Sequence, residues 1–122
     1  MQIERRTRRS DNITQALRLQ LAACQLAGRL DGMVLADRDG LPLAQVGERS
    51  ACEEIAGRMA LVGQRVASYR GTIRTEAGAW AVHMRRVTVA GAGLYLCAIG
   101  GTRTERQRQI VRSSAGVERI LA

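Results

Sequence analysis

Only a few residues of this 122-residue chain have side chains whose type and spacing could support catalysis. His83 and Cys97 could form a Cys–His pair, in which the imidazole activates the thiol as a nucleophile. No acidic partner or oxyanion motif accompanies them, and Cys97 lies within an apolar stretch, which favours packing or surface roles for both residues. Asp37 and Asp39 could act as a carboxylate pair, but the pattern Asp-x-Asp-Gly is typical of a turn.

The composition excludes several other chemistries. A single histidine rules out sites that need two or more His ligands, and the three cysteines form no CxxC pair of the zinc-ribbon or thioredoxin type. All 19 basic residues are Arg, so a Walker-A loop, a kinase lysine and a Schiff-base lysine are all excluded. No GxGxxG sequence follows a predicted strand. The sequence therefore predicts no catalytic residue, no cofactor and no metal.

Length and composition predict one globular domain. Hydrophobic residues make up 46% of the chain and charged residues 25%, while aromatic residues reach only 2%, so the core must be aliphatic. We expect a basic N-terminal tail over residues 1–10 and a folded domain over residues 11–122. The tail is interpreted as solvated chain or a frayed helix start, with electrostatic attachment to an acidic partner as the alternative.

Cysteine usage and hydropathy predict a cytoplasmic protein. Three cysteines that are far apart in the sequence are typical of reduced thiols in a cytosolic core. The Arg-rich N-terminus lacks the apolar segment of a signal peptide. The longest apolar run, Ala90–Gly101, has 12 residues and four glycines, so no membrane partner is expected.

Hydrophobic periodicity and turn signals predict the fold class. The expected elements, in chain order, are a helix over 12–27, strands over 32–37 and 41–46, a helix over 50–68, strands over 70–76, 80–89 and 94–99, and a helix from 102 onward. The strands 32–37 and 94–99 are apolar on both faces and should lie inside the sheet. This order predicts an α+β fold with α/β/α layers, in which helices cover both faces of a five-stranded, mainly antiparallel sheet.

The helix expected over 50–68, which Ser50 should cap, carries two stripes. The stripe of large side chains consists of Ile55, Met59, Val62 and Val66. The neighbouring stripe of small side chains consists of Ala56, Ala60, Gly63 and Ala67. We expect the large stripe to fill a sheet face and the small one to let another helix backbone approach. Arg58 and Arg65 lie seven residues apart on a third face.

The two predicted edge strands differ in whether they can pair with a further strand. Pro42 cannot donate a backbone hydrogen bond, so strand 41–46 belongs at a closed edge. Strand 70–76 is polar and has no proline, so it belongs at an open edge that can accept another strand.

The segment Leu30–Ala44 resembles the first hairpin of the roadblock/dynein-light-chain family, and within it the bacterial gliding-motility-regulator type. The shared features are a small apolar strand, a D-x-D-G-type turn and a strand of the form hydrophobic-Pro-hydrophobic-Ala. The Ala-rich helix 50–68 and the Gly-rich strand 93–101 also match, and the resemblance covers about residues 12–121.

This resemblance implies strand order 2-1-5-4-3 and a homodimer in which the open edges join and the two long helices pack side by side. It also implies a non-enzymatic protein, because members are platforms for small Ras-like GTPases or adaptors in larger assemblies, and some bacterial members accelerate GTP hydrolysis by their partner. The expected dimer interface comprises Ala56, Ala60, Gly63, Ala67, Thr72, Ile73 and Arg74. The candidate GTPase contacts are Arg58 and Arg65, although a solvated arginine is the simpler interpretation of each.

Three functions are carried forward. The first is a homodimeric regulator that binds a small Ras-like GTPase and stimulates its hydrolysis of GTP. The alternative is a structural adaptor or scaffold subunit without an effect on hydrolysis. The third, suggested by the net charge of +8, is a nucleic-acid-binding module. Nucleic acid is disfavoured because no recognition motif is present and most arginines are spread over every element.

Overall fold

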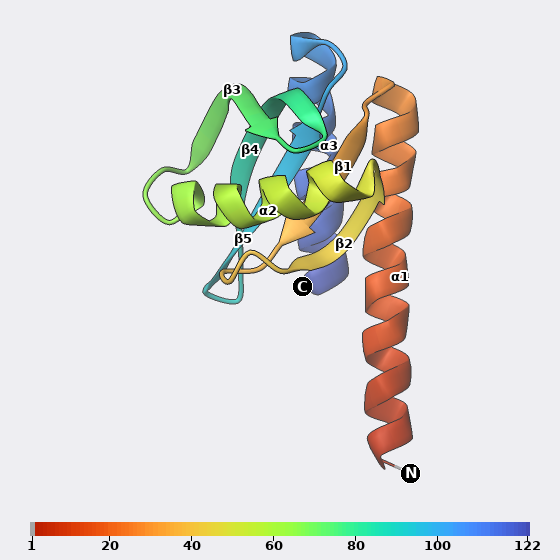
Figure 1. Ribbon diagram of the computed structural model, residues 1–122. Coiled ribbons are helices and arrows are strands. Elements are labelled where there is room, and N and C mark those ends of the chain that lie inside the picture. Colours follow the sequence, from red (N-terminus) through yellow and green to blue (C-terminus); the bar gives the residue numbers. More distant parts are fainter. Residues whose placement is uncertain (1) are drawn as a thin grey trace.

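The computed structural model describes the backbone of residues 2–122 and the side chains of residues 11–122 (Figure 1). Its elements, in chain order, are α1 (Gln2–Gly28), β1 (Gly32–Ala36), β2 (Pro42–Gly47), α2 (Arg49–Gly63), β3 (Ser68–Thr75), β4 (Gly78–Val89), β5 (Ala92–Ile99) and α3 (Arg103–Leu121). The order of helices and strands is the one that the hydrophobic pattern predicts.

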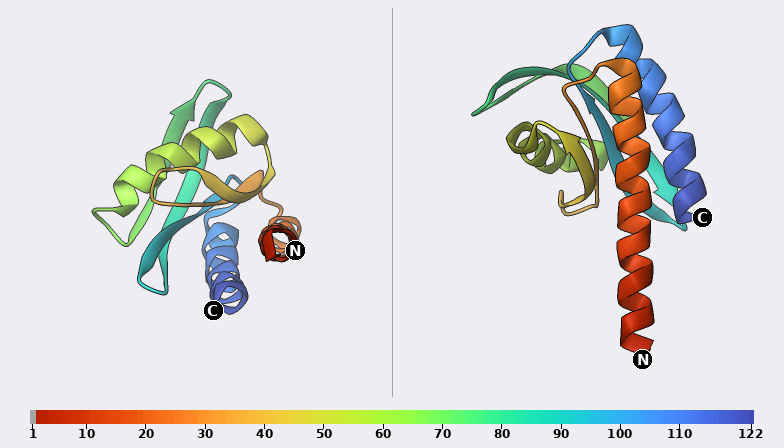
Figure 2. Two further views of the ribbon diagram at one scale, coloured as in Figure 1. Left: turned by 90° about the horizontal axis from the view of Figure 1, so that it is seen from below. Right: turned by 90° about the vertical axis from the view of Figure 1, so that its right-hand side faces the viewer.

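The five strands form one sheet in the order β2-β1-β5-β4-β3, and every neighbouring pair is antiparallel. This confirms the predicted topology. Helix α2 covers one face of the sheet, and α1 and α3 lie side by side on the other (Figure 2). Strands β1 and β5 are central, and all five residues of β1 are buried. Their lack of polar alternation follows from having a helix layer on both sides.

Two apolar clusters hold the layers together, one on each face of the sheet. The cluster under α2 contains Ile55, Met59, Val34, Met84 and Cys97 among its buried members. The cluster under α1 and α3 contains Leu17, Leu21, Met33, Leu96 and Ile110. Both are built from aliphatic and sulfur-containing side chains, as the scarcity of aromatic residues requires.

Helix α1 begins earlier than the sequence predicts. The sequence predicts a helix over 12–27 with Asp11 or Asn12 as its cap, yet the helix starts at Gln2 and runs through both positions. The prediction was wrong because a capping residue ends a helix only where the preceding chain leaves the helical conformation, and no proline or glycine before Gly28 forces it to do so. Gly28 is the last residue of α1, and a Cβ atom there would lie 2.7 Å from Cγ of Gln109 on α3. Its lack of a side chain thus permits close packing of α1 against α3.

Helix α2 also differs from its predicted bounds. The cap is Glu48 rather than Ser50, because the Glu48 carboxylate accepts a hydrogen bond from the Ala51 amide at 2.7 Å. The helix ends at Gly63, five residues before the predicted position, with Gln64 as its C-terminal cap. The chain has to turn there because β3 already starts at Ser68. Ala67 and Arg65 therefore follow α2 and do not continue its helical faces.

The Asp-x-Asp-Gly segment forms the expected turn between β1 and β2. The Asp37 carboxylate accepts hydrogen bonds from the amides of Asp39 at 2.9 Å and Leu41 at 3.0 Å. Gly40 has φ of +81°, a conformation that residues with a side chain rarely adopt. Asp37 therefore organises the turn, which agrees with the turn interpretation of the carboxylate pair.

Candidate protein-interaction surface

Strand β3 is an open edge of the sheet, and its backbone geometry shows which groups face outward. The Gly100 amide donates to the Ala81 carbonyl at 2.8 Å, so the backbone groups of Ala81 point toward β5. Thr72 lies opposite Ala81 in the β3–β4 register. Because the backbone groups of Ala81 point away from β3, Thr72 and Ala81 form a non-hydrogen-bonded pair of the antiparallel ladder. Thr72 therefore directs its N–H and C=O away from β4. Because the pattern alternates, Arg70 and Arg74 do the same.

The three predicted interface residues of β3 have different environments. The side chains of Thr72 and Arg74 are exposed. Ile73 is only 9% exposed and packs in the cluster under α2. Its backbone groups face β4 by the same alternation, so Ile73 presents neither a side chain nor a backbone group to a neighbouring strand. The role of these three residues in a dimer interface stays a prediction.

The small stripe of α2 lies against the sheet of its own protomer. Ala56 and Ala60 are at most 1% exposed, and both belong to the core under α2. A Cβ atom on Gly63 would lie 2.2 Å from Cδ1 of Tyr95. The stripe is small because the helix packs closely on its own sheet, so it does not form the exposed strip that the sequence analysis expected. Ala67 is exposed but lies beyond α2, where its carbonyl accepts from the Arg86 amide at 2.8 Å.

The outward face of α2 instead carries Gly57 and Leu61. Leu61 is 70% exposed, and a Cβ atom on Gly57 would meet no other atom within 4 Å. These two residues, one helical turn apart, were missed by the sequence analysis. The sequence pattern could have identified Gly57 and Leu61, because neither belongs to the stripe of large side chains or to the stripe of small side chains. We call Gly57 and Leu61 the outer α2 patch.

Arg58 and Arg65, the two predicted GTPase contacts, lie in different surroundings relative to the outer α2 patch. The Arg58 guanidinium forms an ion pair with Glu54 at 3.2 Å, and its side chain is 52% exposed. Arg65 is exposed and lies in the turn after α2, where its amide donates to the Val62 carbonyl at 3.0 Å. The predicted spacing of Arg58 and Arg65 along one helix face is therefore not present. An ion pair this exposed leaves Arg58 free to exchange partners.

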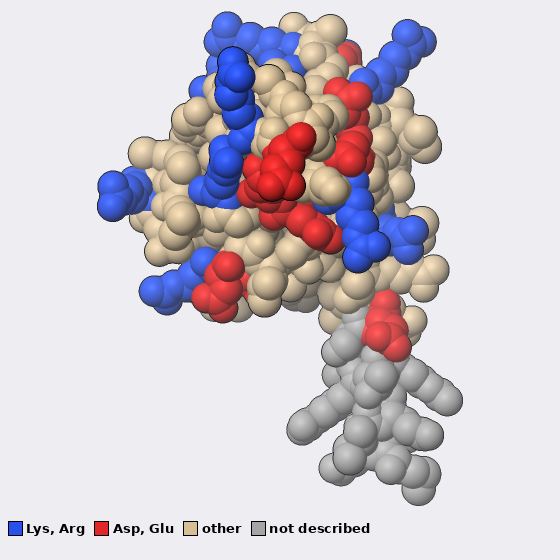
Figure 3. Space-filling view, in the orientation of Figure 1, with Lys and Arg blue, Asp and Glu red and all other residues tan. Residues whose placement is uncertain are grey.

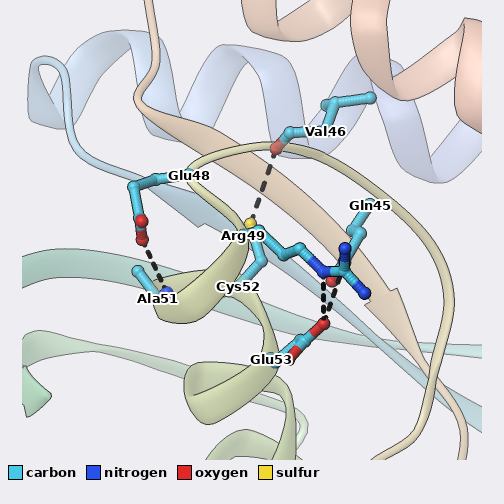
Figure 4. Close-up of polar contacts among 7 residues, drawn as sticks. All are labelled: Gln45, Val46, Glu48, Arg49, Ala51, Cys52 and Glu53. Carbon is cyan, nitrogen blue, oxygen red and sulfur yellow. Dashed lines mark hydrogen bonds and ion pairs between the residues drawn. The ribbon is translucent and has the colours of Figure 1, made fainter. Parts of the chain in front are cut away.

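Acidic side chains gather near the start of α2, and basic ones lie mostly around the rim of the same face (Figure 3). Glu53 accepts from Arg49 Nε at 3.0 Å and from Gln45 at 3.4 Å (Figure 4). The hydrogen bond from Arg49, followed by that from Gln45, lowers the pKa of Glu53. The neighbouring Glu54 and Glu76 line a hollow together with Glu53. Carboxylates therefore gather beside the outer α2 patch, where Glu53 is paired with Arg49 and Glu54 with Arg58.

The structure does not bring the candidate catalytic residues together. Cys97 belongs to the core under α2, whereas His83 lines a pocket with residues of α3 on the other side of the sheet. Burial raises the pKa of the Cys97 thiol, and burial also raises the pKa of Cys52 to about 12. Since the thiolate is the reactive form, these cysteines have the character of packing residues.

Within the described part of the chain, no group of three His, Cys, Asp or Glu side chains could hold a metal ion. Among the same residues, no helix has both the length and the apolar character that a membrane span needs.

The fold is that of the roadblock class, in which this strand order is sandwiched between one helix and a pair of helices. The structure of MglB from Myxococcus xanthus matches with a TM-score of 0.67 over 88% of each chain, at 11% sequence identity. Gliding protein MglB from Thermus thermophilus matches with a TM-score of 0.65 and 16% identity, over 89% of this chain and 90% of that one. A Roadblock/LC7 domain from Streptomyces avermitilis matches with a TM-score of 0.52 and 13% identity, over 86% of this chain and 98% of that one.

No protein-family model and no curated protein sequence matches the chain. The likeness to solved structures therefore establishes the fold, and it confirms the fold that the hairpin resemblance implied.

Proposed function

We propose that this protein is a cytoplasmic, bacterial, homodimeric platform that binds a small Ras-like GTPase and has no catalytic site of its own. The observation that carries the proposal is the open edge of β3, where Thr72 directs its backbone groups outward. The roadblock fold, shared with MglB structures, supports it.

The open edge provides the dimer contact in this proposal. An exposed strand edge pairs readily with another strand unless proline, charge or a covering element prevents it. β3 contains no proline, whereas the opposite edge strand β2 begins with Pro42. Antiparallel pairing of two β3 strands would satisfy the outward groups of Thr72 in both protomers and produce a symmetric contact.

Thr72→Pro tests the dimer. Proline removes the outward N–H of Thr72 but leaves the inward hydrogen bonds of Gly71 and Ile73 to β4 in place. We expect the wild-type protein to sediment as a dimer, Thr72→Pro as a folded monomer, and the control Thr72→Ala as a dimer. A wild-type protein that is monomeric at micromolar concentration would contradict the proposal.

The outer α2 patch, with Arg58 beside it, is the proposed GTPase contact. Leu61 supplies an exposed apolar anchor, while the half-buried Gly57 packs its backbone against Gly40 of the β1–β2 turn. Arg58 can leave Glu54 for a partner carboxylate or phosphate, since the present ion pair is exposed. Stimulation of hydrolysis could then arise from this arginine or from repositioning the GTPase's own residues.

A purified Ras-like GTPase from the same organism is the partner for the binding test. We expect nucleotide-dependent binding and faster phosphate release, and at least about tenfold weaker binding for Leu61→Glu. Leu26→Glu, which changes a leucine that is 75% exposed on α1, is the matched control and should bind normally. Binding without a rate change would favour the adaptor alternative, and absence of a complex would refute the platform.

A further inference from the structure

A second feature of the molecule lies on the opposite face of the sheet, at the beginning of α3. A pocket of about 360 Å³ is lined by Arg70 of β3, His83 of β4, and Arg103 and Arg106 of α3. Arg70 and His83 are directly opposite each other in the β3–β4 register. Helix α3 contacts β4 and β5, so its first turn places two arginines beside this pair.

His83 is a polar side chain buried at this pocket without a partner. It is only 7% exposed, and no hydrogen bond joins its ring to another of residues 11–122. Burial lowers the pKa of His83, and the positive charges of Arg70, Arg106, Arg85 and Arg103 lower it further. The ring nitrogens of His83 are not among the fully buried side-chain atoms that lack a hydrogen-bond partner, so they are accessible from the pocket, where a bound anion can accept a hydrogen bond from the ring.

The arginines of the pocket also lack counterions. The ion pairs among the described residues are Arg49–Glu53, Arg58–Glu54 and Arg108–Glu105, and none of them includes Arg70, Arg103 or Arg106. Glu105, the acidic residue in the first turn of α3, is already engaged by Arg108 and Gln109. The positive charges at the pocket are therefore not neutralised by a carboxylate of residues 11–122.

The local backbone reinforces this electropositive character. Thr102 caps α3 by accepting from the Glu105 amide at 3.1 Å, so the positive end of the helix dipole lies at Arg103. Arg106 Nη1 donates to the carbonyls of Gly100 and Gly101, each at 2.9 Å. These bonds fix the direction of the Arg106 guanidinium and leave its other N–H groups available.

We propose that this pocket binds the phosphate oxyanions of a small phosphorylated molecule. Arg70 and Arg103 supply guanidinium groups that can donate two parallel hydrogen bonds each, Arg106 adds a fixed charge, and His83 contributes a ring nitrogen. A ligand with a single carboxylate would neutralise only part of the charge of the three arginines. A multiply charged phosphate or diphosphate therefore fits the pocket better than a carboxylate. The volume suits a small ligand. The site is separate from the outer α2 patch, but it borders the proposed dimer contact because Thr72 also lines the pocket.

The test uses the full chain and exploits its single histidine, whose ring resonance in NMR spectra is assigned without ambiguity. Pyrophosphate is titrated into the protein while the His83 Cε1–H signal is followed. We expect a saturable shift and a rise of the His83 pKa on binding, because a bound anion favours the protonated ring. Parallel titrations with inorganic phosphate and with ADP show whether the pocket binds free phosphate or a nucleotide.

Arg70→Gln and Arg103→Gln are the principal variants, because both side chains are exposed and form no ion pair among the described residues. Each should weaken pyrophosphate binding by at least about tenfold. Arg119→Gln, in the last turn of the same helix, removes an equal charge away from the pocket and should leave the affinity unchanged.

Two results would overturn the proposal. The first is a His83 signal that none of the three phosphates shifts in a saturable manner at low ionic strength. The second is equal weakening by Arg119→Gln and Arg103→Gln, which would mean a diffuse response to net charge. Tight binding of a DNA duplex with no response to the small phosphates would also reject this site in favour of a phosphate-backbone surface.

Discussion

Gly63 packs directly under the ring of Tyr95, so that a Cβ atom at Gly63 would lie 2.2 Å from Cδ1 and 2.3 Å from Cε1 of the tyrosine. Tyr95 belongs to the central strand β5 and is 3% exposed, so its ring has little space into which it can move. This contact sets how closely the end of α2 approaches the sheet. It also explains why the small face of α2 is turned inward.

Gly63→Ala should therefore destabilise the protomer itself, by about 1–3 kcal/mol in the free energy of unfolding. The matched control is Gly57→Ala on the outward face of α2, where a Cβ atom meets nothing. That variant should stabilise the fold by about 0.5–1 kcal/mol, because alanine favours the helix. Urea unfolding measures both changes. Equal stability of the two variants would show that Tyr95 does not constrain Gly63.

The first turn of α2 offers a test of its capping residue. Glu48→Ala removes the acceptor for the Ala51 amide and should lower the free energy of unfolding by about 1 kcal/mol. Ser50→Ala, at the position that the sequence pattern favoured, should change it by no more than about 0.5 kcal/mol. Chemical denaturation of the two variants distinguishes the caps, and a larger loss for Ser50→Ala would restore the original expectation.

Thiol reactivity should follow burial. Cys24, Cys52 and Cys97 are all buried and free, and the raised pKa values of Cys52 and Cys97 keep these thiols protonated near neutral pH. We expect all three to react slowly with a water-soluble disulfide reagent in the native state and rapidly in denaturant. The absorbance of the thiolate that the reagent releases measures the rate of the reaction. A fast-reacting cysteine in the native protein would contradict the assignment of all three to the core.

Stability should decrease as the pH falls through the range in which histidine titrates. The pKa of His83 is lowered in the folded state, so the unfolded chain takes up the proton at a higher pH than the folded one. The free energy of unfolding should therefore be smaller at about pH 5.5 than at about pH 7.5. His83→Gln should show less of this loss. An identical pH dependence in the variant would assign the effect to carboxylates instead.

Part of the fold could be predicted because the pattern that specifies it is local. The Asp37 turn, the absence of polar alternation in β1 and β5, and Pro42 at an edge strand each follow from the conformational preferences of a few neighbouring residues. The element order was confirmed for this reason, whereas the strand order, also confirmed, had been implied by the family resemblance. The exact start of α1 and the end of α2 were less predictable, because helices stop where the tertiary path of the chain requires a turn.

The candidate surface depended on more than the local pattern. The periodicity of α2 determined by itself that Ala56, Ala60 and Gly63 share one face, but not which neighbour that face meets. The tertiary structure placed it against Tyr95 and turned Leu61 outward, because a ring on β5 needs the space that a missing side chain leaves. In the same way, the sequence determined that Arg70, His83 and Arg103 are polar residues in three separate elements. These residues reach one pocket only in the folded chain. The β3–β4 register places Arg70 opposite His83, and the packing of α3 on the sheet places Arg103 beside them.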